Sequence, residues 1–470
     1  MVAQSYLRVS GDRIVDGSGR TVRLRGYCLG GWLNMENFIT GYPASEMQQR
    51  RAMRQVMGDE AYEAFFDEFL DVFVSEADAA YLGDDLGTNA CRIPVSYKHF
   101  ESDDDPMVLK PEGLARLDRV VEQLAAHGIY SIIDMHALPG CQNHHWHSDN
   151  PTHWPMFWEQ RSFQERGTWL WEVLTEHYKG NGWVAGMNLM NEPADEEGTR
   201  LLRWYAETER RVRAIDPDRM LFLDGNRYST DFSMFTEPLP NTVYTAHDYV
   251  VVGIRPEGRY PATFEGQTYD KGSLEQQFLR RTEFMRSHGM PVWIGEFAPQ
   301  YLGDPVRDEE RYRLLADQLD IYRDYGASWA AWTYKDIGLQ GVVYADPDSA
   351  WLRRLAGYLT KKTRLGADSW GGTDRDVRHI MGPIEQTVAA EAPDFDPYPW
   401  GVQKWSARLV RHILLSEALL PEYAECFRGV GPDEARALAR SFAFENCRHR
   451  PGLEAVLRDG LAKDAAALSS

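Results

Sequence analysis

The pattern of apolar and polar positions divides most of the chain into short strand-like runs and longer helix-like segments. The strand-like runs lie at residues 22–30, 88–95, 130–137, 184–192, 220–226, 242–249, 291–297 and 328–336. Segments 111–128 and 308–326 instead repeat apolar residues at helical spacing and end at a glycine. Alternating strands and helices predict parallel strands joined by right-handed crossovers. Eight such strands predict an α/β protein, a (β/α)8 TIM barrel.

An open, doubly wound sheet is the alternative fold. Such a sheet is expected to carry a phosphate-binding loop with GxGxxG spacing after its first strand. The segment GYCLGGW at 26–32 lacks that spacing, which favours the barrel.

The two ends of the chain depart from the alternating pattern. A hairpin-like lead with a turn signal at Gly17–Gly19 comes first, and from about Arg364 no further strand is predicted. Helices are predicted at 375–392, 400–420 and 431–447 instead. We therefore expect a barrel with a short N-terminal β-hairpin at residues 1–363 and a C-terminal helical extension at 364–470, packed on the barrel. An oligomerisation surface is the alternative role for the helices, and the oligomeric state stays open.

Composition narrows the class of protein. The net charge of −20 disfavours nucleic acid and anionic membranes as partners, and no apolar run reaches the roughly 20 residues that a membrane span needs. The five cysteines are scattered without CxxC spacing, and the N-terminus shows no secretory signal pattern, so we expect reduced thiols and a cytoplasmic location. The 15 Trp and 23 Tyr residues suit sugar stacking as well as core packing.

Two strand-like runs end on a glutamate. Glu192 follows the apolar run VAGMNLM, and Glu296 follows VWIG. In barrels the reacting groups lie at the carboxyl ends of the strands, so the two side chains can meet across the mouth. Two carboxyl groups roughly 5–5.5 Å apart suit hydrolysis of a glycoside by double displacement. The alternative is that each glutamate forms an ordinary ion pair at the barrel rim.

The motifs MNLMNEP and WIGEF, in this order on a (β/α)8 pattern, resemble glycoside hydrolase family five, a family of retaining glycosidases. The resemblance covers about residues 24–358 and matches strand by strand. It implies that Glu296 is the nucleophile, Glu192 the acid/base, and that a carbohydrate is bound without cofactor or metal. The other residues that it places at the site are Arg92, His136, Asn191, His247, Tyr249 and Trp332.

Chemistry gives each of these residues a role. Hydrogen bonds from Arg92 and Tyr249 are expected to keep Glu296 ionised, whereas loss of water raises the pKa of Glu192. Asn191 is expected to hold the 2-hydroxyl of the sugar. The remaining three side chains are expected to bind sugar hydroxyls, orient Glu192 or form the floor of the sugar site.

Two further stretches narrow the subgroup. GYCLGGWLNMEN and the loop after the third strand resemble the exo-acting β-1,3-glucanase branch, with Glu36 placed to bind the terminal sugar. We therefore expect release of a terminal glucoside, mannoside or furanoside such as a galactofuranoside or arabinofuranoside. An endo-acting β-glucanase or glycolipid hydrolase and a non-catalytic carbohydrate-binding barrel are the alternatives.

The insertion NHHWHSDNPTHW brings four histidines close together in the sequence: His144, His145, His147 and His153. A metal-dependent hydrolase is one interpretation, but the spacing HHxH on a loop lacks a third ligand on rigid structure. We expect instead that the loop walls the pocket, with Trp146 and Trp154 as candidate sugar contacts. Local packing is the alternative for both tryptophans.

Overall fold

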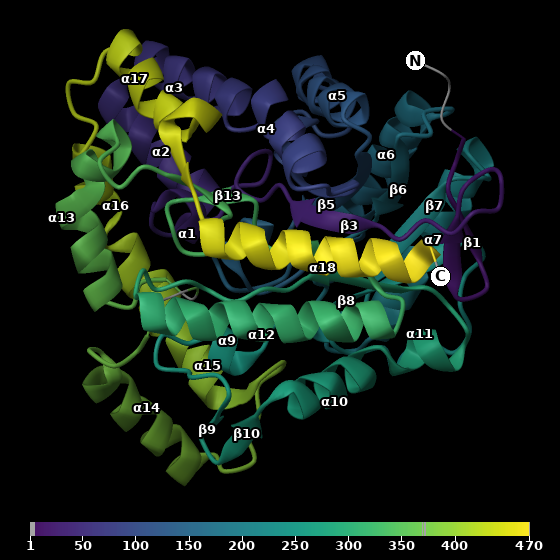
Figure 1. The fold of residues 1–470 in the computed structure, drawn as a ribbon. Coiled ribbons are helices and arrows are strands. Elements are labelled where there is room, and N and C mark those ends of the chain that lie inside the picture. The colour runs from purple at the N-terminus through teal and green to yellow at the C-terminus, as the bar shows by residue number, and fades with distance from the viewer. Residues whose placement is uncertain (1–4, 369, 371–372, 470) are drawn as a thin grey trace.

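Eight parallel strands close a barrel at the centre of the computed structural model, which describes residues 5–368, 370 and 373–469 (Figure 1). The barrel strands are β3 (Arg25–Cys28), β4 (Ala90–Ser96), β5 (Tyr130–Ala137), β6 (Val184–Asn188), β7 (Met220–Asp224), β8 (Thr242–His247), β11 (Val292–Glu296) and β12 (Ser328–Ala331). They pair in this order, and β12 pairs with β3 to close the barrel. Each strand coincides with one of the eight predicted runs, so the predicted barrel is confirmed.

Helices fill the connections between the strands. They are α1 (Asn37–Thr40), α2 (Glu46–Met57), α3 (Asp59–Val72), α4 (Glu76–Ala80), α5 (Pro111–Ala126), α6 (Arg161–Tyr178), α7 (Thr199–Ile215), α8 (Asn226–Ser229), α9 (Val251–Ile254), α10 (Lys271–Arg281), α11 (Glu283–Ser287), α12 (Pro305–Asp324) and α13 (Ala350–Arg364). The helices predicted at 111–128 and 308–326 are α5 and α12. Each begins at a proline, whose missing N–H costs nothing in the first turn. The Asp304 side chain caps α12 by accepting hydrogen bonds from two backbone N–H groups.

The N-terminal hairpin pairs β1 (Arg8–Ser10) with β2 (Arg13–Val15), so its turn lies at Gly11 and Asp12 rather than at the predicted Gly17–Gly19. Segment 17–19 forms a second turn, in which the N–H of Gly19 donates to the carbonyl of Asp16. A second small hairpin, β9 (Ala262–Phe264) and β10 (Gln267–Tyr269), lies between β8 and β11.

Within its described residues, the C-terminal region contributes five α-helices: α14 (Arg378–Glu391), α15 (Gly401–Ala407), α16 (Leu420–Glu425), α17 (Pro432–Ala439) and α18 (Pro451–Ser469). Apolar side chains of α16, α17 and α18, such as Tyr423, Leu438 and Leu457, belong to the same continuous core as the barrel. Met381 of α14 and Ala407 of α15 belong to a separate small cluster. The long helix α18 lies alongside α12 (Figure 1). Asp464 of α18, 4% exposed, forms ion pairs with Arg23 and Arg25 at the start of β3. The division of the chain at 363/364 stays a prediction.

Two expectations for this region are wrong. A strand does follow Arg364, because β15 (Cys447–His449) pairs with β14 (Val343–Ala345), which in turn pairs with β13 (Lys335–Asp336). Three residues are too few to show a strand pattern in the sequence. The helix predicted at 431–447 is also too long, since α17 ends at Ala439 and Cys447 already belongs to β15. The backbone of the helix predicted at 400–420 is helical over residues 401–417, with a π-helical segment at Arg408–Leu415. Among the described residues, no helix combines the length and the apolar character that crossing a bilayer requires.

Candidate active site

Glu296 and His247 lie side by side at the carboxyl ends of β11 and β8. The register of these strands shifts between Ile294 and Glu296, so that Glu296 pairs with His247. The extra residue in this bulge is Gly295, where a Cβ would lie 2.4 Å from the side chain of Thr245. Only glycine fits there, and the bulge turns the Glu296 carboxylate toward the barrel mouth.

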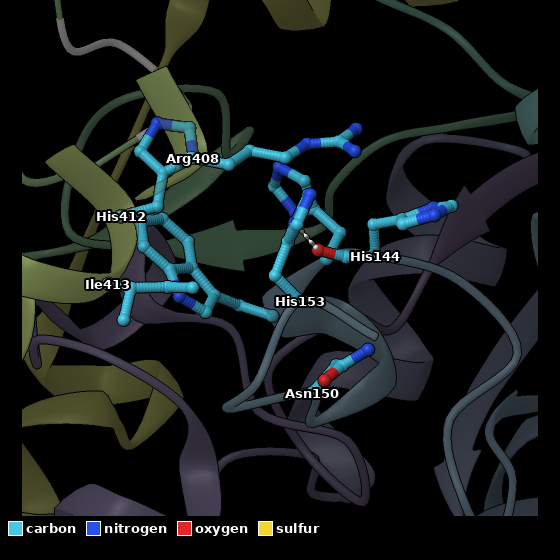
Figure 2. Close-up of a pocket in the computed structure, with 8 residues that line it drawn as sticks. His144, Asn150, His153, Arg408, His412 and Ile413 are labelled. Atoms are coloured by element: carbon cyan, nitrogen blue, oxygen red, sulfur yellow. Dashed lines mark hydrogen bonds between the residues drawn. The ribbon is translucent and has the colours of Figure 1, made fainter. Parts of the chain in front are cut away.

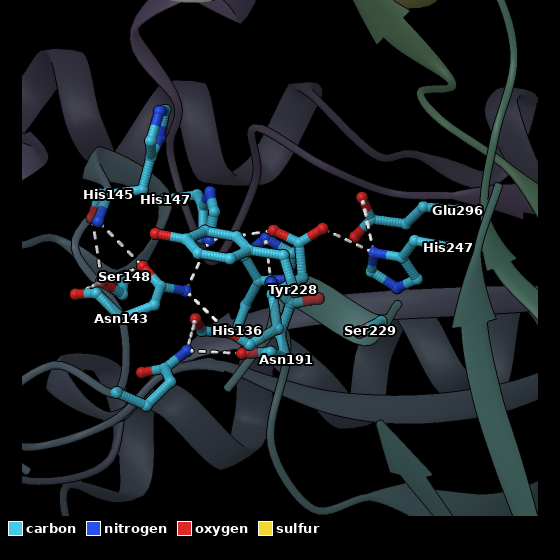
Figure 3. A network of polar contacts seen from close by, with 12 residues as sticks. His136, Asn143, His145, His147, Ser148, Asn191, Tyr228, Ser229, His247 and Glu296 are labelled. Atoms are coloured by element: carbon cyan, nitrogen blue, oxygen red, sulfur yellow. Dashed lines mark hydrogen bonds and ion pairs between the residues drawn. The ribbon is translucent and has the colours of Figure 1, made fainter. Parts of the chain in front are cut away.

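Glu192 follows β6 in a left-handed backbone conformation, with φ of 45°. Its N–H donates to Asp224 Oδ2 over 2.9 Å, and its Oε1 lies 2.7 Å from His247 Nδ1. One carboxylate oxygen of Glu192, one of Glu296 and a ring nitrogen of His247 all lie within 4.8 Å of one another. The two predicted glutamates therefore meet, and His247 lies beside both (Figure 3).

Arg92 of β4 is fully buried and joins several of the predicted site residues. Its Nη1 donates to Glu296 Oε1 and its Nη2 to Asn191 Oδ1, each over 2.7 Å. The same Nη2 lies 3.1 Å from Asp134 Oδ2. A buried guanidinium with this many acceptors fixes the position of each.

The two glutamates differ in their surroundings. Burial raises the pKa of Glu296 to about 7, and this rise is opposed by Arg92 and by the Tyr249 hydroxyl, which donates to Oε2 over 2.9 Å. Burial raises the pKa of Glu192 well above its ordinary value, and the charge of Glu296 raises it further. Because Glu296 accepts a hydrogen bond from the cationic side chain of Arg92, it ionises first, and Glu192 keeps its proton.

His136, Trp332 and Glu36 form the opposite side of the site. The His136 ring stacks on the Trp332 indole with centroids 5.3 Å apart and planes at 10°. His136 Nδ1 lies 2.7 Å from Asp134, and its Nε2 lies 3.2 Å from the Asn191 amide and 3.4 Å from Glu36 Oε1. An indole face with polar groups around it is an arrangement that suits a sugar ring.

The histidine-rich loop after β5 reaches Glu192 directly. His147 Nε2 lies 3.2 Å from Glu192 Oε2, and Asn143 Nδ2 donates to the Glu192 carbonyl over 2.9 Å (Figure 3). The sequence indicated that this loop walls the pocket, but it did not single out His147 or Asn143.

Trp146 lies elsewhere. It is 5% exposed, and its ring packs on His412 of the C-terminal region at 4.6 Å. With His144, His145, His153 and Arg408 it lines a cavity of about 10 Å³, a volume that fits one water molecule (Figure 2). Local packing, the alternative weighed above, is what the structure shows for this ring. Trp154 is 53% exposed. In the described part of the chain, no loop histidine belongs to a three-ligand group with spacing for a metal ion.

Sequence reasoning also missed contacts supplied by distant segments. Tyr228 lies in a turn after β7 in which three successive residues have φ between 52° and 61°. The C-terminal region holds this turn: Arg408 Nη2 donates to the Tyr228 hydroxyl over 3.1 Å, and Trp400 packs on its ring at 4.4 Å. Trp370 packs edge-on against Tyr249 at 4.8 Å. Asp134 inside β5 and Asp224 at the end of β7 were visible in the sequence as acids that follow the apolar pairs of IID and FLD.

Comparison with known proteins places this site in a family. The model of the cellulase family, glycosyl hydrolase family 5, matches residues 59–338. The chain belongs to glycosyl hydrolase family 5. This confirms the resemblance drawn from NEP and GEF and makes the protein an O-glycosyl hydrolase.

Relatives of this family 5 chain cover it to different extents. It is 46% identical to a beta-xylosidase of Phanerodontia chrysosporium over 97% of this chain and 98% of that protein. It is 30% identical to a probable glucan 1,3-beta-glucosidase A of Emericella nidulans over 58% of this chain and 67% of that one. The crystal structure of a rutinosidase from Aspergillus niger has the same fold, with a TM-score of 0.51, 19% identity and coverage of 68% of this chain and 93% of that one.

Proposed function

We propose that this family 5 enzyme is a retaining, exo-acting β-glycosidase that removes one terminal sugar by double displacement. The observation that carries the proposal is the pair Glu192 and Glu296, which have carboxylate oxygens within 4.8 Å of each other, while direct hydrogen bonds from Arg92 and Tyr249 oppose the rise in pKa at Glu296. An inverting enzyme needs a separation of roughly 6.5–9.5 Å to hold a water between its carboxyl groups.

Each step has a residue to perform it. The Glu296 carboxylate attacks the anomeric carbon while Glu192 gives its proton to the leaving oxygen, and the glycosidic bond breaks. Glu192 then takes a proton from water, whose oxygen attacks the same carbon and releases Glu296. Arg92 and Tyr249 hold the nucleophile, and Asn191 faces the site through its amide.

Xylose is the first sugar to test, because the relative matched over nearly the whole chain is named a beta-xylosidase. Glucose is the second sugar to test, because another relative is named a probable glucan 1,3-beta-glucosidase A. A chain-end pocket is supported by Glu36 beside His136 and by the histidine-rich loop, whose His147 contacts Glu192. Endo-acting and non-catalytic alternatives are less well supported, since both carboxylates are present and this loop lies against one of them.

The test is hydrolysis of a panel of aryl β-glycosides, pyranosides and furanosides together, with NMR of the first product. Release of a single β-configured sugar supports the proposal and names the sugar. A first product of inverted configuration would end the double-displacement proposal. Cleavage of oligosaccharides only at internal bonds would replace exo with endo action.

We also propose a cytoplasmic location. All five cysteines are free thiols in the structure, two of them buried, which suits a reducing compartment. Cell fractionation with an antibody to the chain tests this, and recovery from the culture medium would contradict it.

A further inference from the structure

The hydrogen bonds of Asn143 determine which atoms of its side chain face the active site. Its Oδ1 accepts from the backbone N–H of His145 and from the Ser148 hydroxyl, each over 2.9 Å. Its Nδ2 donates to the Glu192 carbonyl over 2.9 Å and lies 2.7 Å from His147 Nε2. A backbone N–H can only donate and a carbonyl can only accept, so the amide has one orientation. Its second N–H therefore points at His147 Nε2.

This orientation sets the tautomer of His147. Nε2 accepts the hydrogen from Asn143, so it carries no proton of its own, and the neutral ring is protonated on Nδ1. Burial lowers the pKa of His147 well below its ordinary value, with His136, Arg408 and Arg92 acting in the same direction, which keeps the ring neutral. The unprotonated Nε2 lies 3.2 Å from Glu192 Oε2.

The other Glu192 oxygen is already occupied. His247 Nδ1 lies 2.7 Å from Glu192 Oε1 and 3.5 Å from Glu296 Oε2, so two carboxylate oxygens face it and it acts as a donor. An ionised Oε2 would be repelled by the electron-rich Nε2 of His147, whereas a protonated Oε2 can share the Nε2 lone pair with the Asn143 N–H in a bifurcated hydrogen bond. We propose that His147, oriented by Asn143, is a positioning residue that places the acid proton of Glu192 on Oε2 and favours the protonated form.

The inference rests on the proposed function and deepens it. In the first step the Glu192 Oε2–H group passes its proton to the leaving oxygen. This release is easy because the contact with His147 Nε2 is long, at 3.2 Å, and the Nε2 already accepts the Asn143 N–H. In the second step the Oε2 anion faces the same lone pair, which makes it a stronger base toward water. His147 stays neutral in both steps: Glu192 gives its proton to the leaving oxygen in the first and takes a new proton from water in the second.

Other charged groups also act on Glu192 and His147, and the experiment must keep them constant. Those that face Glu192 are Glu36, Arg92, Asp224, His247 and Glu296. Those that face His147 are His136, His145, Tyr228, Arg92 and Arg408. All of them are unchanged in both variants below, so they cancel in the comparison.

The experiment compares His147→Gln with His147→Leu. The glutamine amide oxygen can accept both hydrogens, and leucine can accept neither. With leucine we expect the basic limb of the kcat/KM profile to move about one unit to lower pH, the size of one neutral hydrogen bond. We also expect kcat/KM to fall about tenfold for alkyl glycosides and far less for dinitrophenyl glycosides, because only poor leaving groups need the acid. We expect His147→Gln to restore the wild-type position of the basic limb and the wild-type dependence of kcat/KM on the leaving group.

His145→Leu is the matched control. Its ring stacks on His147 at 5.1 Å in the same loop, and no hydrogen bond or ion pair joins it to Glu192 in the part of the chain that the structure describes. We expect the basic limb of the kcat/KM profile of His145→Leu to stay at the wild-type pH even if the melting temperature of this variant falls. The position of a limb does not depend on the fraction of enzyme folded, so a destabilised leucine variant still tests the proposal.

Two results would overturn the inference. One is a leucine variant with the wild-type limb, and the other is an equal loss on all leaving groups. Glu192→Ala, measured on the same substrates, distinguishes a failure of the His147 role from a failure of Glu192 as the acid. If it spares dinitrophenyl glycosides and His147→Leu does not, Glu192 remains the acid and only the role of His147 fails. If Glu192→Ala loses activity equally on all substrates, the assignment of Glu192 as the acid fails.

Discussion

Replacing Tyr249 by phenylalanine tests how the nucleophile is kept ionised. The hydroxyl donates to Glu296 Oε2 over 2.9 Å, and this bond lowers the carboxyl pKa against the effect of burial. A hydrogen bond to a charged group contributes about 1.5–3 kcal/mol, and one pKa unit corresponds to about 1.36 kcal/mol. Tyr249→Phe should therefore raise the pKa of Glu296 by about 1–2 units.

The direction of the effect on activity follows from the role of nucleophile proposed for Glu296. The nucleophile must be ionised, so kcat/KM falls as the pH drops below its pKa. With a wild-type pKa of about 7, the acid limb should move to about pH 8–9 in the variant, and the loss at pH 6 should be about 10–100-fold. The loss should shrink as the pH rises through the new limb.

The assay is the pH profile of kcat/KM on an aryl β-xyloside, or on whichever aryl glycoside the panel identifies. Tyr260→Phe is the control, because its hydroxyl bonds a different carboxylate, Asp317, over 2.6 Å. That variant should leave the acid limb in place. A Tyr249→Phe profile that falls by the same factor at every pH would show that Glu296 does not produce the acid limb.

Four further outcomes can be checked. Glu296→Ala should abolish turnover without changing the melting temperature by much, and azide should partly restore glycoside cleavage; full activity would remove the nucleophile assignment. Glu192→Ala should retain the first step on dinitrophenyl glycosides and lose it on alkyl glycosides. Asp464→Ala should cost about 3–5 kcal/mol of unfolding free energy by leaving Arg23 and Arg25 unpaired, with kcat/KM unchanged; an unchanged denaturation midpoint would contradict this. Chelators should leave activity intact, and a loss reversed by zinc would revive a metal mechanism.

The barrel and its two glutamates were predictable because both depend on local patterns. An apolar run that ends in a polar residue predicts a barrel strand with a side chain at the mouth, and this rule placed Glu192 and Glu296 together. Arg92 lies inside its strand and was placed by the family resemblance. The rule needs no knowledge of how loops run. The NEP and GEF motifs added the identity of the family, and the family model agrees.

Contacts that depend on loop paths were not predictable. Trp146 and His147 are neighbours in the sequence, yet one packs on His412 and the other contacts Glu192. Their separation comes from the left-handed and 3-10 turns of the loop around 145–149, which leave no periodic signal. Tyr228 and Trp370 depend on packing between segments far apart in the chain, where no single sequence shows the pairing.

The left-handed turn after β7 has a consequence for how this protein can evolve or be engineered. Residues at positive φ each cost of order 1 kcal/mol, and here the compensating contacts come from 172 residues later, where Arg227 donates to Pro399 and Tyr398 donates to Asn226. A barrel recombined with a foreign C-terminal region would lose those contacts and the placement of Tyr228. The unit of inheritance is therefore the whole chain, in keeping with a relative that matches 97% of it.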